Sequence, residues 1–225
     1  MPSTLDRVDE ILALLAGAGA PPPTLLVVAG KDWNSEGIDW LRGRVEAGHP
    51  LAGHGWTHQA AWPRSLYHRL HAALMSGDQG EHLSRSPDEL RAVVRQCHAW
   101  FGNVDLPSPR LYVPPAWELG ALTQVDLRTL PFPRYETLTG FIDAATGRRT
   151  TVPLVGFEAP TALTSLALRT SNSLNLLLAR AWRGSIRVAL HPRDLELRLR
   201  DRVRGLIAQP WAWTNEPGGF PSPAR

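Results

Sequence analysis

Apolar residues along the chain fall either in short runs or at the spacing of one helix face. Short apolar runs are typical of buried strands, and they predict strands at residues 24–28, 50–53, 111–113 and 186–190. Residues 137–142 and 150–155 are predicted to form a hairpin around Thr146 and Gly147.

Helical stripes fill most of the intervals between these strands. Near the start of the chain, Leu5, Val8, Ile11 and Leu15 recur at helical spacing. Further helices are predicted at residues 35–48, 66–75, 87–101, 119–127, 163–182 and 194–207. Because strands alternate with helices, we expect a parallel sheet wrapped by helices. We expect one domain over residues 3–210 and a loose tail, rich in Pro and Gly, over residues 211–225.

Composition and charge narrow the possible partners. The chain has 225 residues, of which 43% are hydrophobic, and its net charge is +3. No basic cluster is interleaved with aromatic residues, so we expect no nucleic-acid partner. No apolar run approaches the roughly 20 residues that cross a bilayer, and no signal peptide is visible, so we expect a cytoplasmic protein without a membrane partner. Cys97 is the single cysteine, and its place on an apolar helical stripe predicts a buried structural thiol.

Two histidines follow the predicted strand at residues 50–53. His54 and His58 are four residues apart, so their imidazoles can converge on one cation. Gly53 and Gly55 allow the backbone a tight path at this point. The alternative is a pair of unrelated loop histidines, because this spacing also arises by chance.

His191 ends the predicted strand at residues 186–190 and precedes Pro192. A histidine at the carboxyl end of a strand can act as a general acid near neutral pH, but it can also be a capping or surface residue. Asp32 follows the strand at 24–28 and either reaches a site or solvates a loop, and Glu81 is a weaker acidic candidate.

The segment Pro114-Pro115-Ala116-Trp117 combines a stiff backbone with a flat apolar face. Sugars and other small ligands stack on such faces. Trp33 and Trp56 also lie in predicted loops at the ends of strands, where they could bind a ligand or pack in the core. Core packing is the preferred interpretation for three tryptophans at helical spacing, Trp40, Trp100 and Trp182.

Four segments, in their order along the chain, resemble the NodB-homology polysaccharide deacetylases: TLLVVAGKDW, LAGHGWTH, YVPPAW and VALHPRDL. The likeness is closest to an uncharacterised bacterial branch whose first strand ends in His-Asp-Val. The resemblance implies an α/β fold, a distorted (β/α) barrel with fewer than eight complete units. It implies a divalent metal, usually zinc, bound by Asp-His-His, with His54 and His58 as the two histidines. It also implies His191 as the general acid, and Pro114, Pro115 and Trp117 as a groove wall.

The sequence departs from the family pattern at two places. The family's metal-binding and base aspartates lie on a strand before the first helix, and nothing here corresponds to that strand. We therefore expect a barrel that lacks its first strand, either because the recorded start is internal or because the strand was lost. Val113 stands where many members have an arginine that holds the base aspartate.

These features favour a metal-dependent hydrolase that removes acetyl groups from N-acetyl sugars or a polysaccharide. Its activity would be impaired unless Asp32 or Glu81 replaces the missing base. One alternative is a non-catalytic carbohydrate-binding module on the same scaffold. A more distant alternative is a metal hydrolase that acts on a non-sugar amide.

Overall fold

The computed structural model describes residues 2–57, 85–182 and 184–215. The chain divides into two compact units, one formed by residues 1–2 and 24–149 and the other by residues 3–23 and 150–225. The predicted single domain over residues 3–210 stays a prediction. The helix predicted at residues 66–75 lies outside the described residues, as do His58 and Glu81.

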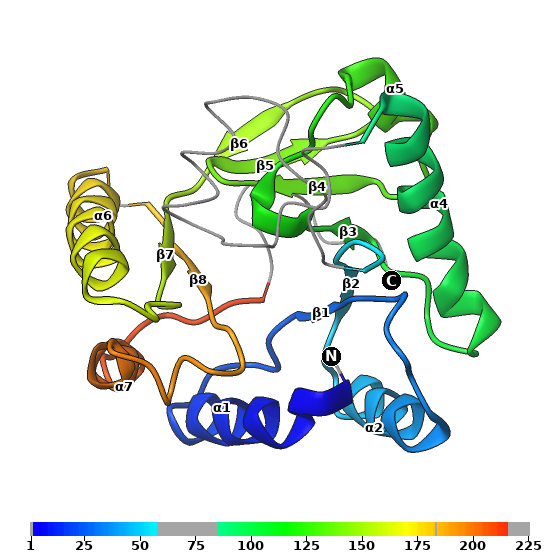
Figure 1. Ribbon diagram of the computed structural model, residues 1–225. Helices are drawn as coiled ribbons and strands as arrows, with labels where there is room; N and C mark the ends of the chain where they lie inside the picture. Colours follow the sequence, from blue (N-terminus) through cyan, green and yellow to red (C-terminus); the bar gives the residue numbers. More distant parts are fainter. Residues whose placement is uncertain (1, 58–84, 183, 216–225) are drawn as a thin grey trace. The chain divides into compact units, whose positions relative to one another are not determined.

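The first unit contains a mainly parallel sheet with helices beside it (Figure 1). Its helices are α2 (Ser35–Glu46), α4 (Pro87–Asn103) and α5 (Gln124–Thr129). Its strands are β1 (Leu25–Val27), β2 (Leu51–Gly53), β3 (Leu111–Tyr112), β4 (Arg134–Thr137) and β5 (Gly140–Asp143), and the unit ends as β6 (Arg149–Thr151) begins. The strand order is β1-β2-β3-β4-β5-β6, parallel from β1 to β4 and antiparallel between β4 and β5.

The strand register brings the loops after β1, β2 and β3 to one edge of the sheet. Val27 pairs with Gly53, and Gly53 pairs with Tyr112. Because all three strands are parallel, the residues that follow these positions emerge side by side. Among the described residues, β1 forms an outer edge of this sheet, and it follows the first helix in the chain.

The core of the first unit is packed closely around Gly53. Tyr112, Phe132 and Cys97 are fully buried in one cluster, and the rings of Tyr112 and Phe132 have centroids 5.0 Å apart. A Cβ atom at Gly53 would lie 2.8 Å from Phe132 and 2.9 Å from Cys97, so only glycine fits without displacing the core. The predicted burial of the Cys97 thiol is confirmed.

The second unit contains a two-stranded parallel sheet. Its helices are α1 (Leu5–Gly17), which a 3-10 turn (Pro2–Thr4) precedes in the chain, α6 (Ala162–Ala181) and α7 (Arg200–Ile207), and its strands are β7 (Leu154–Gly156) and β8 (Arg187–Ala189). α6 lies beside β7 and covers its backbone with amide side chains. Asn172 donates to the carbonyl of Gly156 at 2.7 Å, and Asn175 donates to that of Leu154 at 2.7 Å.

Most of the predicted elements are present, and the α/β class is confirmed. Two predicted helices begin later than expected. The helix predicted at 119–127 starts at Gln124, because Thr123 and Asp126 form a capping box there. The helix predicted at 194–207 covers only Arg200–Ile207, because the Asp194 side chain closes a turn with His191 instead.

The predicted hairpin differs in its strands. The turn at Thr146 and Gly147 is present, and it joins β5 to β6. Residues 137–142 instead contain the end of β4, a turn and the start of β5. The prediction of core packing is wrong for Trp182, whose side chain is 65% exposed, whereas Trp40 and Trp100 pack against the core. No helix in the described part of the chain is long and apolar enough to cross a membrane.

Candidate functional site

His54 continues the line of β2 and is held by the strands on either side of it. Its backbone N–H donates to the Val27 carbonyl at 2.9 Å. Its ring Nδ1 lies 2.6 Å from the Val113 carbonyl oxygen. A carbonyl oxygen only accepts, so Nδ1 must carry the hydrogen. In a neutral imidazole, Nε2 then keeps its lone pair, which is the tautomer that metal-ligating histidines use.

Asp32 lies in the loop after β1, and its side chain is exposed. Within residues 2–57, 85–182 and 184–215, no three His, Cys, Asp or Glu side chains are grouped so that they could hold a metal ion. His58 and Glu81 are not among those residues. The metal ligands His54 and His58 and the base Asp32 therefore stay predictions.

The loops after β1 and β2 are joined by Gly30 and Trp56. The Gly30 N–H donates to the Trp56 carbonyl at 2.8 Å. A Cβ atom at Gly30 would lie 2.6 Å from the Trp56 indole, so the ring rests directly on the glycine backbone. Gly55, next to Trp56, has a φ of 72°, which L side chains rarely adopt. The two loops therefore fit together only with glycine at these points.

Trp33 and Trp56 both pack partly against the core of the first unit. The Trp33 Nε1 donates to the Val28 carbonyl at 2.9 Å. Its ring centroid lies 5.9 Å from that of Trp100. Both rings are thus fixed and half-buried. Their predicted role as ligand-binding faces stays a prediction.

The segment after β3 holds Trp117 in an unusual conformation. Ala116 and Trp117 both have positive φ, 56° and 57°, and each left-handed non-glycine residue costs roughly 1–3 kcal/mol. The Trp117 Nε1 donates to Glu136 Oε1 on β4 at 3.0 Å. Pro114 and Pro115 are buried, so they support the turn from beneath. The predicted substrate-binding role of Pro114, Pro115 and Trp117 stays a prediction.

In the second unit, Glu158 and His191 lie at equivalent positions just beyond the ends of two neighbouring strands, β7 and β8. Gly156 pairs with Ala189, and each of the two polar residues comes two positions later. Because the strands are parallel, both side chains emerge at the same end of the sheet. His191 Nε2 lies 3.6 Å from Glu158 Oε2, and both side chains are partly exposed.

Asp194 is the buried carboxylate beside His191. Its Oδ2 accepts the backbone N–H of His191 at 2.8 Å and lies 3.9 Å from His191 Nδ1. Burial raises the pKa of Asp194 to about 6, against the opposing effect of His191, and Glu158 raises that pKa further. His191 therefore lies between two carboxylates, one partly exposed and one buried.

Three polar residues of these sites were not predicted from the sequence: Glu136, Glu158 and Asp194. Glu158 carried a usable signal, because it follows a predicted strand in the same way as His191 does. Asp194 lies three residues after His191, a spacing at which a carboxylate can bond back to the backbone. Nothing in the sequence links Glu136 to Trp117, because their contact depends on the pairing of β3 with β4.

No family model and no curated protein matches this chain. Among solved structures, it is similar to the crystal structure of a candidate polysaccharide deacetylase from Mycobacterium smegmatis. The TM-score is 0.62 at 19% identity, over 92% of this chain and 71% of that chain. A likeness of this kind shows a shared fold, so the deacetylase-type α/β fold that the four motifs predict is confirmed.

Two other solved structures match less well. One is a family 4 acetyl xylan esterase from Clostridium thermocellum in complex with a cobalt ion, with a TM-score of 0.38 and 13% identity over 84% of each chain. The other is a family 4 carbohydrate esterase from Streptomyces lividans in complex with acetate, with a TM-score of 0.40 and 15% identity over 90% of this chain and 78% of that chain. Both TM-scores are too low to show a shared fold, and nothing about this chain follows from them.

Proposed function

We propose that this protein is a metal-dependent hydrolase that removes acetyl groups from sugars or a polysaccharide. The observation that carries the proposal is the hydrogen bond from His54 Nδ1 to the Val113 carbonyl, which fixes the orientation of the ring and the tautomer that metal-ligating histidines use. The fold shared with a candidate polysaccharide deacetylase supports the same reaction class.

In this proposal His54 and His58 hold a divalent cation, for which zinc is the expected ion. When bound, the cation supplies Lewis acidity toward the acetyl carbonyl. A carboxylate must complete the ligand set and another must take the proton of the attacking water, since catalytic zinc sites use three protein ligands. Asp32, which is exposed in the loop after β1, is the base that we propose within the described residues, and Glu81 is the other candidate.

His191 is the proposed proton donor. Water attacks the acetyl carbon, the base accepts the proton of that water, and protonated His191 gives a proton to the leaving amine or alkoxide, so that acetate is released. Glu158 Oε2 lies 3.6 Å from His191 Nε2 and Asp194 Oδ2 lies 3.9 Å from its Nδ1, so two carboxylates flank the ring. The backbone N–H of His191 is bonded to Asp194, which fixes the turn from which the ring projects.

Trp117 is the proposed platform for the sugar ring. Its indole is fixed by Glu136 and by the left-handed turn, so little conformational freedom would be lost on binding. Trp33 and Trp56 are further stacking candidates in the loops after β1 and β2. Such rigid aromatic faces suit carbohydrate ligands.

The test compares metal binding with acetate release in the full chain. The protein is stripped with a chelator and titrated with zinc or cobalt, and acetate is measured with chito-oligosaccharides, acetylated xylan and non-sugar amides. We expect His54→Gln to lose both zinc binding and acetate release, whereas His49→Gln, the same change in the turn after α2, keeps both. We expect His191→Gln to bind zinc normally and to lose 10²–10⁴ in kcat, the usual contribution of general acid catalysis.

Two outcomes would contradict this function. Equal zinc affinity in the unchanged chain and in His54→Gln would show that His54 does not bind the metal. Binding of chito-oligosaccharides without acetate release or zinc dependence would instead support a carbohydrate-binding module.

A further inference from the structure

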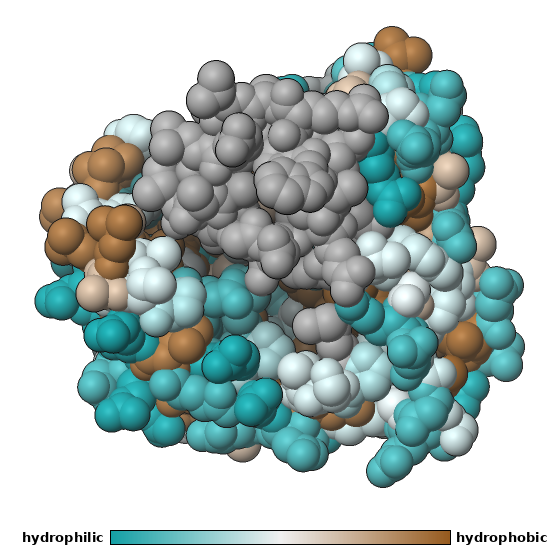
Figure 2. Space-filling model, viewed as in Figure 1, coloured by the Kyte–Doolittle hydropathy of each residue, from teal (hydrophilic) through white to brown (hydrophobic). Residues whose placement is uncertain are grey.

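Helix α6 presents an apolar outer face that no described residue covers. Of the large hydrophobic side chains that are exposed in the described residues, four belong to α6 and one is its C-cap residue: Leu163, Leu166, Leu174, Leu177 and Trp182. Each is between 56% and 67% exposed. Apolar side chains gather over α6 in Figure 2. Contiguous exposed apolar patches on a folded protein mark interaction surfaces.

The four leucines form one narrow stripe. An α-helix turns by about 100° per residue, so Leu163, Leu166, Leu174 and Leu177 all point within about 40° of the direction of Thr170. The opposite side of the helix packs on the second unit, where Asn172 forms hydrogen bonds with the backbone of β7. The stripe is therefore presented outward by a helix whose inner face is already anchored.

One flank of the stripe is cationic. Arg169 and Arg180 both lie roughly 80–100° from the centre of the stripe and on the same side of it. α6 contains no acidic residue. Two copies of this helix placed face to face would thus bring like charges together, which disfavours self-pairing. A negatively charged partner is complementary to this flank.

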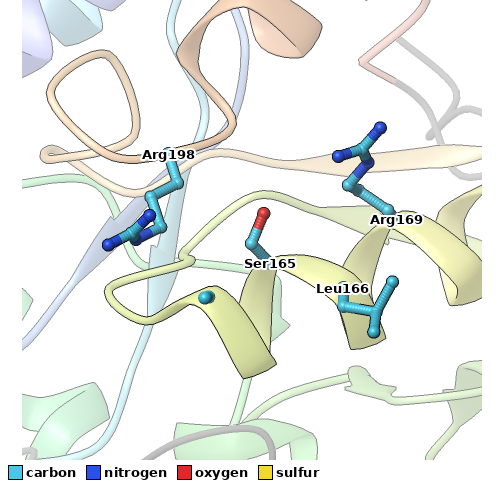
Figure 3. Close-up of a pocket in the computed structure, with 5 residues that line it drawn as sticks. Ser165, Leu166, Arg169 and Arg198 are labelled. Carbon is cyan, nitrogen blue, oxygen red and sulfur yellow. The ribbon is translucent and has the colours of Figure 1, made fainter.

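A pocket of about 370 Å³ lies on the same flank. It is lined by Ala162, Ser165, Leu166, Arg169 and Arg198. Figure 3 shows Ser165 between the two arginines in that view, with its hydroxyl directed away from the helix. Two guanidinium groups and a hydroxyl are the donors that recognise a phosphate.

The two pocket arginines lack carboxylate partners. Neither Arg169 nor Arg198 has an ion pair with any residue that the structure describes. The carboxylate of Glu196 pairs with Arg7 at 2.6 Å and with Arg193 at 3.6 Å instead. The positive charge in the pocket is thus not neutralised by these acidic side chains.

We propose that the outer face of α6 binds the surface of an anionic phospholipid bilayer, with Arg169 and Arg198 contacting headgroup phosphates. The leucine stripe enters the boundary between headgroups and acyl chains, and Trp182 is exposed at the C-cap of the same helix. Leucines on one side, arginines beside them and a nearby tryptophan are the features of a helix that lies in the membrane plane. This binding is peripheral, and it is independent of the proposed hydrolase activity.

The test is sedimentation of the full chain with two kinds of vesicle, phosphatidylcholine alone and equal parts of phosphatidylcholine and phosphatidylglycerol. We expect binding only to the anionic vesicles. We expect Leu166→Glu with Leu174→Glu to reduce it to the level of phosphatidylcholine alone. The matched control is Val125→Glu, which changes an equally exposed apolar residue on α5 and should bind as the unchanged chain does.

A second pair of variants tests the pocket without touching the leucines. Arg169→Gln with Arg198→Gln should weaken partitioning into anionic vesicles by roughly tenfold or more, because each basic residue near such a surface contributes separately. Arg95→Gln with Arg110→Gln removes the same charge in the first unit and should change partitioning far less. These variants remain informative if the leucine variants fail to fold, which circular dichroism would show.

Four results would overturn the proposal. One is equal sedimentation with both kinds of vesicle, and another is equal loss of binding in both arginine pairs. The third is a concentration-dependent dimer, detected by sedimentation velocity, that disappears in the leucine variants while vesicles are not bound, because the stripe would then pair with a second copy. Binding of inorganic phosphate without any vesicle binding would likewise exclude the lipid surface.

Discussion

The ring Nδ1 of His54 lies 2.6 Å from the carbonyl oxygen of Val113, so a side chain at the end of β2 is held by the backbone at the end of β3. The backbone N–H of Val113 in turn donates to the Gly53 carbonyl at 2.9 Å. The imidazole is thus oriented by backbone groups alone. Val113 contributes its carbonyl to this contact.

This contact predicts the tautomer of His54. In the metal-free protein above neutral pH, the hydrogen should reside on Nδ1, because the carbonyl can only accept. Nitrogen-15 NMR of the imidazole distinguishes the two ring nitrogens directly, and the His49→Gln variant assists assignment. Finding the hydrogen on Nε2 would contradict both the hydrogen bond and the role of His54 as a ligand through that atom.

Asp194 predicts a measurable pH dependence of stability. The pKa of Asp194 in the folded protein is about 6, above its ordinary value of 3.8, because the carboxyl is buried; His191 opposes this effect and Glu158 adds to it. Between these two pH values the folded state binds more protons than the unfolded state, so this group makes the protein less stable as the pH rises. Asp194→Asn should therefore gain up to roughly 3 kcal/mol relative to the unchanged protein between pH 4 and pH 7.5, as measured by urea unfolding.

Asp143 provides a control of opposite sign. Hydrogen bonds from the side chain and backbone of Thr146 lower the pKa of Asp143. Asp143→Asn should therefore lose stability relative to the unchanged protein as the pH rises through the acidic range. If both variants shifted in the same direction, the burial of Asp194 would not be the cause.

Gly53 predicts a core that does not accept one more methyl group. Gly53→Ala places a Cβ within 3 Å of both Phe132 and Cys97, and overpacking of this kind costs typically 1–3 kcal/mol. Gly43→Ala, inside α2 with open space around it, should instead stabilise by roughly 0.5–1 kcal/mol. The urea midpoint of Gly53→Ala should lie below that of the unchanged protein, and the midpoint of Gly43→Ala above it. If both midpoints shifted in the same direction, this packing would be contradicted.

Glu136 predicts a specific effect on ligand binding. Glu136→Leu removes the acceptor of the Trp117 N–H, whereas Glu136→Gln keeps an oxygen at the same place. We expect the leucine variant to raise KM for an acetylated oligosaccharide by roughly tenfold, the order of one charge-assisted hydrogen bond, and the glutamine variant to stay near the unchanged value. A KM that stays the same in Trp117→Ala would show that this indole does not contact the sugar.

The sequence predicted those parts of the fold that depend on local pattern. The apolar runs identified β1, β2, β3 and β8, and Ser86 with Glu89 forms a capping box that starts α4 at its expected proline. The wrong boundaries arose where a side chain competed with the helix for backbone bonds, as Asp194 does after His191. Trp182 has the helical spacing of a core residue, but it lies at the end of a helix whose outer face is exposed.

Some residues of the candidate sites could be identified from the sequence, and there is a physical reason why the others could not. His191 follows a strand and could be identified from the chain alone. Its carboxylate neighbour Glu158 lies 33 residues earlier in the chain. It becomes a neighbour only through the parallel register of β7 and β8. Long-range pairing of this kind leaves no local signal in either segment.

The contact between Gly30 and Trp56 has a consequence for engineering. The indole rests on the Gly30 backbone, and the Gly30 N–H donates to the Trp56 carbonyl. The loops after β1 and β2 therefore form one packed unit. Grafting one of them from another protein would leave a clash or a void in its neighbour. Directed evolution of specificity here would have to exchange both loops together, with the glycine and the tryptophan transferred as a pair.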